Sequence, residues 1–148
     1  DYGYYHVVAT KDYHVDPGSH FAEEPDFVSS WPVHCVAHTS GADFHPELNT
    51  AVVEAVFHKG AYAAAYSGFE GRLNGVSLAD WLRSREVDEV DVVGIATDYC
   101  VRATADDAVR SGLGTRVLLD LTAGVAADST AEAMAELRRA GVELVQAP

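Results

Sequence analysis

Hydrophobic residues in the second half of the chain alternate between continuous apolar runs and stripes at helical spacing. The runs are short and nearly unbroken, which is typical of strands buried on both faces, and they cover 90–97, 116–121 and 142–145. Between them, helix-spaced apolar positions cover 99–111 and 128–140, and Gly112 and Gly141 stand where these helices would end. Strands that alternate with helices predict parallel pairing through crossover helices.

The first half is more irregular. Two β-rich runs, 5–10 and 52–57, flank a turn-rich stretch from Gly18 to Asn49. A loop of about 30 residues is uncommon in a compact domain and is usually functional when it occurs. Further along, Ser77-Leu-Ala-Asp80 is typical of a capping box, which predicts a short helix through Arg85.

The fold class predicted from this pattern is α/β, as a three-layer α/β/α sandwich with a mainly parallel sheet. No repeat, low-complexity segment or Gly/Ser linker divides the chain, so we expect a single domain over 1–148. In open parallel sheets the functional site forms at the carboxyl ends of the strands. The polar residues at three such ends, 11–14, 58–59 and 97–100, are therefore the first candidates.

Charge and composition narrow the classes of partner. Ten Lys and Arg residues against 23 Asp and Glu residues give a net charge of −13, which disfavours nucleic acid and anionic membrane surfaces as partners. No apolar run approaches the roughly 18 residues of a membrane span, and the start of the chain lacks the features of a signal peptide. We therefore expect a soluble, cytoplasmic protein. Whether it is a monomer or a homo-oligomer stays open.

The long loop carries the first set of candidate ligands. Asp12, His14, His20 and His34 lie within 23 positions and offer one carboxylate and three imidazoles, a donor set suited to Zn²⁺, Fe²⁺ or Mn²⁺. The alternative interpretation is that these are solvated histidines of a polar loop. The remaining histidines are expected to be structural or solvated, namely His6, His38, His45 and His58.

A second candidate is Cys100, which follows a predicted buried strand and begins a predicted helix. Unpaired N–H groups and the helix dipole at that position lower the pKa of a thiol and can also bind an oxyanion. The alternative is a small core residue. Lys59, at the end of another strand, would favour a thiolate there, although a lone lysine is more often solvated. Cys35 has no such setting and is interpreted as structural.

Several aromatic residues lie in the loops and are able to wall a pocket for a planar ligand. These are Trp31, Tyr62, Tyr66 and Phe69. The alternative for each of them is packing over loop backbone.

Five segments, taken together and in this order, resemble the nicotinamidase/pyrazinamidase family of isochorismatase-like cysteine hydrolases, and its actinobacterial members most of all. They are ATKDYHVDPGSHF, SSWPVHC, GADFHPEL, VFHKGAYAAAYSGFEG and VDVVGIATDYCVRATADDAV, and they span essentially the whole chain. The resemblance implies an amidohydrolase of NAD salvage that converts nicotinamide to nicotinate and ammonia, and pyrazinamide to pyrazinoate, through a cysteine thioester. It also implies one bound divalent metal ion, Fe, Mn or Zn.

The resemblance assigns roles to individual residues. It implies that Cys100 is the nucleophile, that Lys59 is the lysine of the catalytic triad, and that the metal ligands are Asp12, His14, His20 and His34. It further implies a cis peptide between Ile95 and Ala96, with an oxyanion hole formed by the N–H groups of Ala96 and Cys100. The substrate ring would be contacted by Trp31, Tyr66, Ile95 and Tyr99, and at Tyr99 close relatives often carry His.

One feature of the family has no match. Its triad aspartate lies in a motif like Asp-x-Gln-x-Asp-Phe at the end of its first strand, and nothing in this sequence corresponds to it. By this comparison a strand and a helix of roughly 35 residues are lacking. The absence of a central strand would expose apolar sheet edges. Two alternatives therefore accompany the enzyme interpretation: a metal-binding chain without turnover, truncated or a pseudoenzyme, and a related amide hydrolase with another substrate.

Overall fold

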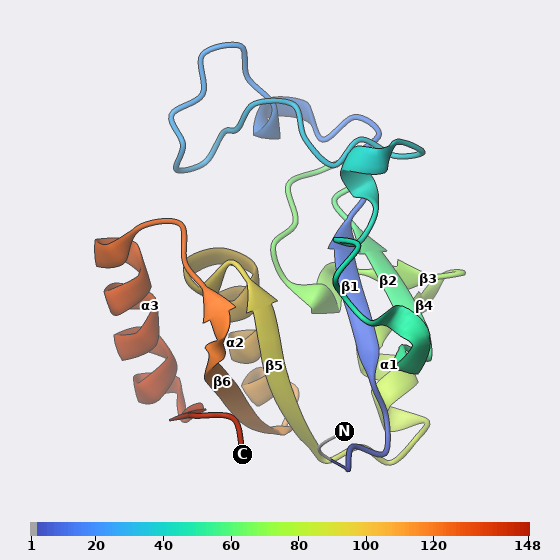
Figure 1. Cartoon of the computed structure of the whole chain (residues 1–148), viewed down its shortest axis with the longest axis vertical. Helices are drawn as coiled ribbons and strands as arrows, with labels where there is room; N and C mark the ends of the chain where they lie inside the picture. The colour runs from blue at the N-terminus through green and yellow to red at the C-terminus, as the bar shows by residue number, and fades with distance from the viewer. Residues whose placement is uncertain (1–2) are drawn as a thin grey trace. The chain divides into compact units, whose positions relative to one another are not determined.

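The computed structural model describes residues 3–148, and these form two compact units (Figure 1). The first unit contains the residues up to 65 together with 70–75, and the second contains 66–69 and 76–148. Among the described residues, no helix is long and apolar enough to cross a membrane.

The first unit is built on a parallel pair of strands. Strand β1 (Val8–Asp12) pairs with β2 (Ala55–Lys59), and the short β3 (Arg72–Leu73) runs antiparallel to β2. The register of the parallel pair places Asp12 opposite Lys59, so both side chains stand at the carboxyl ends of their strands. Both strands lie two or three residues later than the β-rich runs predicted, and β3 was not predicted.

The connection from β1 to β2 is the long irregular loop that the sequence predicts. Its regular structure consists of three short 3₁₀ helices, η1 (Gly18–His20), η2 (Ser40–Ala42) and η3 (Thr50–Val52). Two isolated parallel bridges, His14 with Val36 and Phe21 with Trp31, hold the loop together. Because these bridges join segments that are far apart in sequence, the loop has a defined course despite its lack of longer elements.

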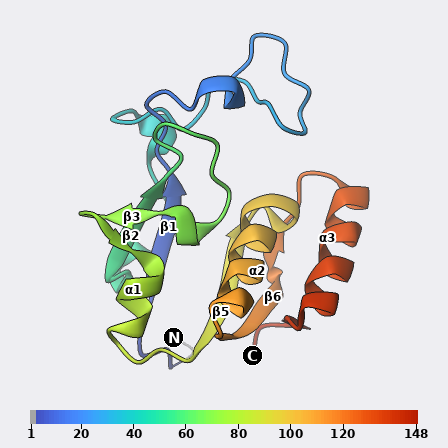
Figure 2. The same cartoon turned by 180° about the vertical axis from the view of Figure 1, so that it is seen from behind.

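The second unit is a parallel sheet with helices. Its strands are ordered β5 (Glu89–Ile95), β6 (Gly114–Ala123) and β7 (Glu143–Val145). The helices α2 (Arg102–Arg110) and α3 (Ala127–Ala140) connect them, and Figure 2 shows these two helices beside each other. The parallel pairing in both units confirms the predicted α/β class with mainly parallel strands.

The helix ends in this unit follow from local sequence. The short β4 (Val76–Ser77) leads into α1 (Leu78–Arg83), where the Ser77 hydroxyl accepts a hydrogen bond from the Asp80 N–H at 3.1 Å, so the predicted helix start capped by Ser77 is confirmed. Helix α3 ends at Gly141, whose φ of 93° is the left-handed conformation that glycine adopts without steric cost. The helix predicted over 99–111 begins instead as a π-helical turn, η5 (Thr97–Val101).

The core of the second unit lies where both helices meet the sheet. Val101, Ala105 and Leu137 pack with Val117 and Val142, and all five are buried. Val117 of the central strand β6 thus packs in a cluster to which both crossover helices contribute side chains. This packing positions η5, and with it the start of α2, against the end of β5.

We predict that Leu137→Ala destabilises the second unit, because the Leu137 side chain is 1% exposed and its truncation leaves a cavity. The expected loss is about 2–5 kcal/mol of the free energy of unfolding. Leu121→Ala on β6 is the matched control, since Leu121 is 43% exposed and should lose much less. Urea denaturation of the three proteins gives the comparison, and equal losses in the two variants would contradict the assigned core.

Candidate active site and metal centre

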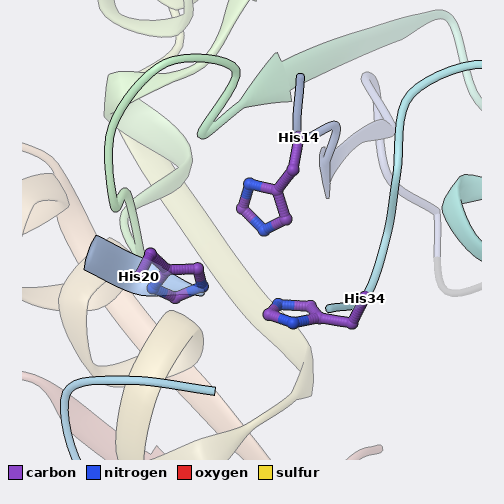
Figure 3. Close-up of side chains that lie close together, drawn as sticks. All are labelled: His14, His20 and His34. Atoms are coloured by element: carbon purple, nitrogen blue, oxygen red, sulfur yellow. The ribbon is translucent and has the colours of Figure 1, made fainter. Parts of the chain in front are cut away.

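Three histidines of the first unit converge on one point (Figure 3). His14 follows β1, His20 ends η1, and His34 comes from the later part of the loop. One ring nitrogen from each lies within 4.8 Å of the others. His14 and His20 are buried, at 1% and 4% exposure, so the interpretation of solvated loop histidines does not hold for these two.

Backbone carbonyl groups select the tautomer of two of these rings. His14 Nδ1 lies 2.6 Å from the Gly60 carbonyl oxygen, and His34 Nδ1 lies 2.7 Å from that of Pro32. A carbonyl oxygen only accepts, so each Nδ1 carries the proton and donates it. In the neutral rings, Nε2 is then left with its lone pair, which is the arrangement usual in metal-ligating histidines.

The Nε2 atom of His14 makes the point at which these rings converge a candidate metal site. This atom is buried and has no hydrogen-bond partner among the described residues. A buried polar atom without a partner costs free energy, and a metal ion bonded to its lone pair would remove that cost. The donor set of the site therefore fits a divalent cation.

The electrostatics around His20 favour the ligand form of its ring. Burial is the main cause that lowers its pKa below the usual value, and the neighbouring rings of His14 and His34 lower the pKa further, against the opposing effect of Asp12. An unprotonated imidazole is the form that binds metal.

Asp12 links the histidines to Lys59. Lys59 is only 4% exposed, and its ammonium donates to Asp12 Oδ1 and, at 3.3 Å, to the Ala65 carbonyl. The other oxygen of the carboxylate, Oδ2, lies 4.0 Å from His14 Nε2. A buried ammonium is costly unless it is paired. Asp12 therefore pairs with Lys59 through one oxygen and faces the histidines with the other.

Cys35 stands at the same centre. Its sulfur, a carboxylate oxygen of Asp12 and a ring nitrogen of His34 lie within 4.8 Å of one another. The chain thus offers a second group of possible ligands that overlaps the first at His34.

Cys100 belongs to the second unit and lies half-buried in the π-helical turn η5, two residues before the start of α2. The Ala96 carbonyl caps this turn by accepting hydrogen bonds from Tyr99 N–H at 3.1 Å and Val101 N–H at 3.0 Å. The peptide between Ile95 and Ala96 is cis, as the family resemblance implies. Single π-helical turns occur often at functional sites, and the start of a helix stabilises a thiolate.

The predicted pocket aromatics divide between the two units. Tyr66 and Tyr99 lie in the second unit with ring centroids 5.5 Å apart, so the ring next to Cys100 in sequence contacts a second aromatic ring. Trp31 lies in the first unit, where its backbone N–H donates to the His20 carbonyl at 2.8 Å and its indole packs edge-on against Phe27. Tyr62 is 75% exposed.

Asp98 anchors the turn that carries Cys100. Its carboxylate accepts hydrogen bonds from the Val125 N–H at 2.9 Å, the Ala126 N–H at 3.3 Å and the Ser129 hydroxyl at 2.5 Å. Burial alone would raise its pKa, but the hydrogen bonds, that from Ser129 first, outweigh burial and hold the pKa below its usual value. Asp98 therefore ties η5 to the beginning of α3.

Sequence reasoning missed the groups that orient the predicted residues. Gly60 follows Lys59 with φ of 73°, and a Cβ atom there would lie 2.7 Å from His14 Cε1, so only glycine fits. Its position after a strand end was the available signal. The carbonyl partner of His34, from Pro32, gave no signal, because any residue supplies a carbonyl.

The chain is similar to known proteins over nearly its whole length. The model of the isochorismatase domain family matches residues 3–148. The chain is 68% identical over 143 residues to the nicotinamidase/pyrazinamidase of Mycobacterium tuberculosis. The matched region covers 96% of this chain and 77% of that protein.

Among solved structures, PnC1 from L. infantum in complex with nicotinate matches with a TM-score of 0.83 and 39% identity, over 95% of this chain and 71% of that one. The pyrazinamidase of Pyrococcus horikoshii in complex with zinc matches with a TM-score of 0.81 and 37% identity, over 96% and 75%. These matches establish an isochorismatase-like α/β fold.

We predict that Gly60→Ala weakens metal binding by about 10–100-fold, because the new methyl group displaces the His14 ring and disturbs its carbonyl partner. Gly75→Ala is the matched control, since Gly75 has a similar φ of 84° but open space around the added Cβ. Calorimetric titration with Mn²⁺ or Zn²⁺ measures the effect. Equal affinities in the two variants would contradict the role of Gly60.

We predict that Asp98→Asn lowers the melting temperature at neutral pH. Because the pKa of Asp98 is lowered by folding, its stabilisation is present above the unfolded-state pKa of about 3.9 and is lost as pH falls through the folded-state value. The difference between the two proteins should therefore shrink below about pH 3.9. Asp107→Asn removes the same charge from α2 and serves as control in thermal melts across pH. A pH-independent difference for Asp98→Asn would refute the argument.

Proposed function

Because the chain belongs to the isochorismatase family, we propose that it is a metal-dependent cysteine amidohydrolase that converts nicotinamide to nicotinate and ammonia, and pyrazinamide to pyrazinoate. The observation that carries the proposal is the buried convergence of His14, His20 and His34 beside the Asp12–Lys59 pair. The likeness to nicotinamidases supports the choice of substrate. The nicotinate released would feed NAD salvage.

Cys100 is the proposed nucleophile. Its thiolate attacks the carboxamide carbon, and as the sulfur–carbon bond forms, an electron pair of the carbonyl moves onto oxygen. The N–H groups of Ala96 and Cys100 are proposed to hold that oxyanion. The carbon–nitrogen bond then breaks as the carbonyl re-forms, and ammonia leaves with the proton that the thiol had lost. Water then adds to the thioester carbon, its oxygen stays on nicotinate, and a proton returns to the sulfur as the thiol is restored. The position of Cys100 in η5, before α2, supports this role.

Lys59 is proposed to act through its positive charge. An ammonium near the reacting group favours the thiolate and the negative charge of the tetrahedral intermediate. Its burial and its pairing with Asp12 support a fixed position for this charge.

The proposed metal ligands are Asp12, His14, His20 and His34. A divalent ion bound there, Fe, Mn or Zn, would supply a Lewis acid that orients the pyridine nitrogen of the substrate. The carbonyl partners of His14 and His34 support the ligand role, since they leave each Nε2 available. The zinc complex of a related pyrazinamidase also supports it.

The proposed substrate pocket is aromatic. In the second unit, Tyr66 and Tyr99 would contact the flat pyridine ring, with Ile95 beside them. The contact between Tyr66 and Tyr99 supports a shared pocket wall next to Cys100.

A second candidate function is metal binding without turnover. It requires only the cluster of His14, His20 and His34, which could hold an ion whether or not Cys100 reacts. The two candidates differ in one measurable respect, since both bind metal but only the enzyme releases ammonia.

We predict that Cys100→Ala lowers ammonia release from nicotinamide by at least about a thousandfold and leaves metal content unchanged, because only the nucleophile is removed. The measurement uses protein expressed from its complete coding sequence, loaded with Mn²⁺ or Zn²⁺, with metal content read by elemental analysis. A metal-loaded wild-type protein that is silent on nicotinamide and pyrazinamide would favour the second candidate. Preference for an amide without a pyridine ring would indicate a related hydrolase.

The metal part of the proposal has its own test. His20→Ala should lower both metal content and ammonia release, because it removes one proposed ligand. His45→Ala is the matched control, since the His45 side chain is 73% exposed and lies outside the cluster, and it should change neither. Unchanged metal content in His20→Ala would remove His20 from the ligand set.

A further inference from the structure

We propose that Cys35 gives the metal centre a second ion position, formed with Asp12 and His34 and selective for strongly thiophilic divalent cations such as Cd²⁺. The proposal starts from the ligand atoms of these three residues, which lie within 4.8 Å of one another. It extends the metal site of the proposed function but does not depend on hydrolysis.

The backbone holds Cys35 at this place. Its carbonyl oxygen accepts a hydrogen bond from the His14 N–H at 2.9 Å, and the Ala37 N–H donates to the His14 carbonyl at 2.8 Å. These two bonds clamp the segment that carries His34 and Cys35 beside the end of β1. The thiol is therefore held near the histidines by backbone hydrogen bonds between segments that are far apart in sequence.

The conformation of Cys35 accounts for its closeness to the same carboxylate as His34. In extended backbone, successive side chains point to opposite sides. Cys35 instead has φ of 45°, in the left-handed region that residues other than glycine adopt infrequently. This turn of the backbone brings two consecutive side chains, His34 and Cys35, into reach of Asp12.

The second position overlaps the first. The three-histidine group and the Asp12–His34–Cys35 group share His34, and the buried His14 Nε2 without a hydrogen-bond partner lies 4.0 Å from the second oxygen of Asp12. Because the groups share a ligand, the chain binds one ion at a time and the identity of the ion decides which group closes around it. An ion that is held through Asp12 and Cys35 also competes with Lys59 for the carboxylate.

Ligand chemistry sets the selectivity. Imidazole and carboxylate ligands suit Mn²⁺ and Fe²⁺, whereas a thiolate favours softer ions. When the ion binds, the Cys35 thiol releases its proton to solvent and the sulfur–metal bond forms. The centre is thus expected to retain Cd²⁺ through sulfur and Mn²⁺ through the histidines.

The test is a titration of the metal-free protein with one equivalent of Cd²⁺, followed by the ultraviolet charge-transfer absorption of a cadmium–thiolate bond. The wild type should show this band. Cys35→Ser should lose it and bind Cd²⁺ at least about tenfold more weakly, while its affinity for Mn²⁺ stays within about twofold. Cys100→Ser is the matched control and should keep the band. A band that persists in Cys35→Ser, or that only Cys100→Ser removes, would overturn the proposal.

Two further measurements separate this proposal from folding defects and from the proposed function. In the wild type, Cd²⁺ should slow alkylation of Cys35, read by peptide mass spectrometry, and leave that of Cys100 unchanged; an unchanged rate at Cys35 refutes the proposal without any variant. His20→Ala should bind Mn²⁺ more weakly yet keep the cadmium–thiolate band. If His20→Ala leaves Mn²⁺ affinity intact, the histidine site fails while the position at Cys35 still stands.

Discussion

The in-register parallel pairing of β1 with β2 is the constraint on which the chemistry of the first unit depends. It sets Asp12 opposite Lys59 at the carboxyl ends of the two strands, where a buried ammonium and a carboxylate compensate each other. The same register brings His14, two residues after Asp12, to the carbonyl group of Gly60, one residue after Lys59. A slip of one residue would turn Lys59 to the other face of the sheet and separate the pair.

The irregular loop holds its histidines in fixed positions because its backbone is bridged to the segment that follows β1. The bridges of His14 with Val36 and of Phe21 with Trp31 give the loop a defined course that short 3₁₀ helices alone would not provide. Buried imidazoles that face one another are unfavourable when protonated, and a bound cation would turn this arrangement into a stable one. The loop is thus ordered, but the grouping of its buried imidazoles carries an unfavourable free energy. A bound metal ion would remove that unfavourable term.

The second unit holds a thiol at the start of a helix. Hydrophobic packing of Val101 and Ala105 against Val117 seats α2 on the sheet. Asp98 then fixes the preceding turn through hydrogen bonds to the beginning of α3. Cys100 lies between these two anchors, so core packing and one buried carboxylate together determine its position.

The sequence by itself determined the class of the fold and the identity of the candidate residues. The α/β class, the helix that Ser77 caps and the helix end at Gly141 all follow from periodicity and capping, which depend on residues a few positions apart. The spacing of the loop histidines and the place of Cys100 before a helix indicated metal and thiol chemistry in the same local way. These features can be predicted from the sequence because the interactions that produce them join residues only a few positions apart.

Only the tertiary structure decided how these residues are arranged. The partner of His14 is 46 residues away at Gly60, and the ion pair of Asp12 with Lys59 spans 47 residues. The tertiary structure also placed Cys35, interpreted from sequence as structural, beside the candidate ligands Asp12 and His34. Strand register and loop bridges set such contacts, and neither leaves a periodic pattern in the chain, because any backbone carbonyl can accept and any nearby carboxylate can pair.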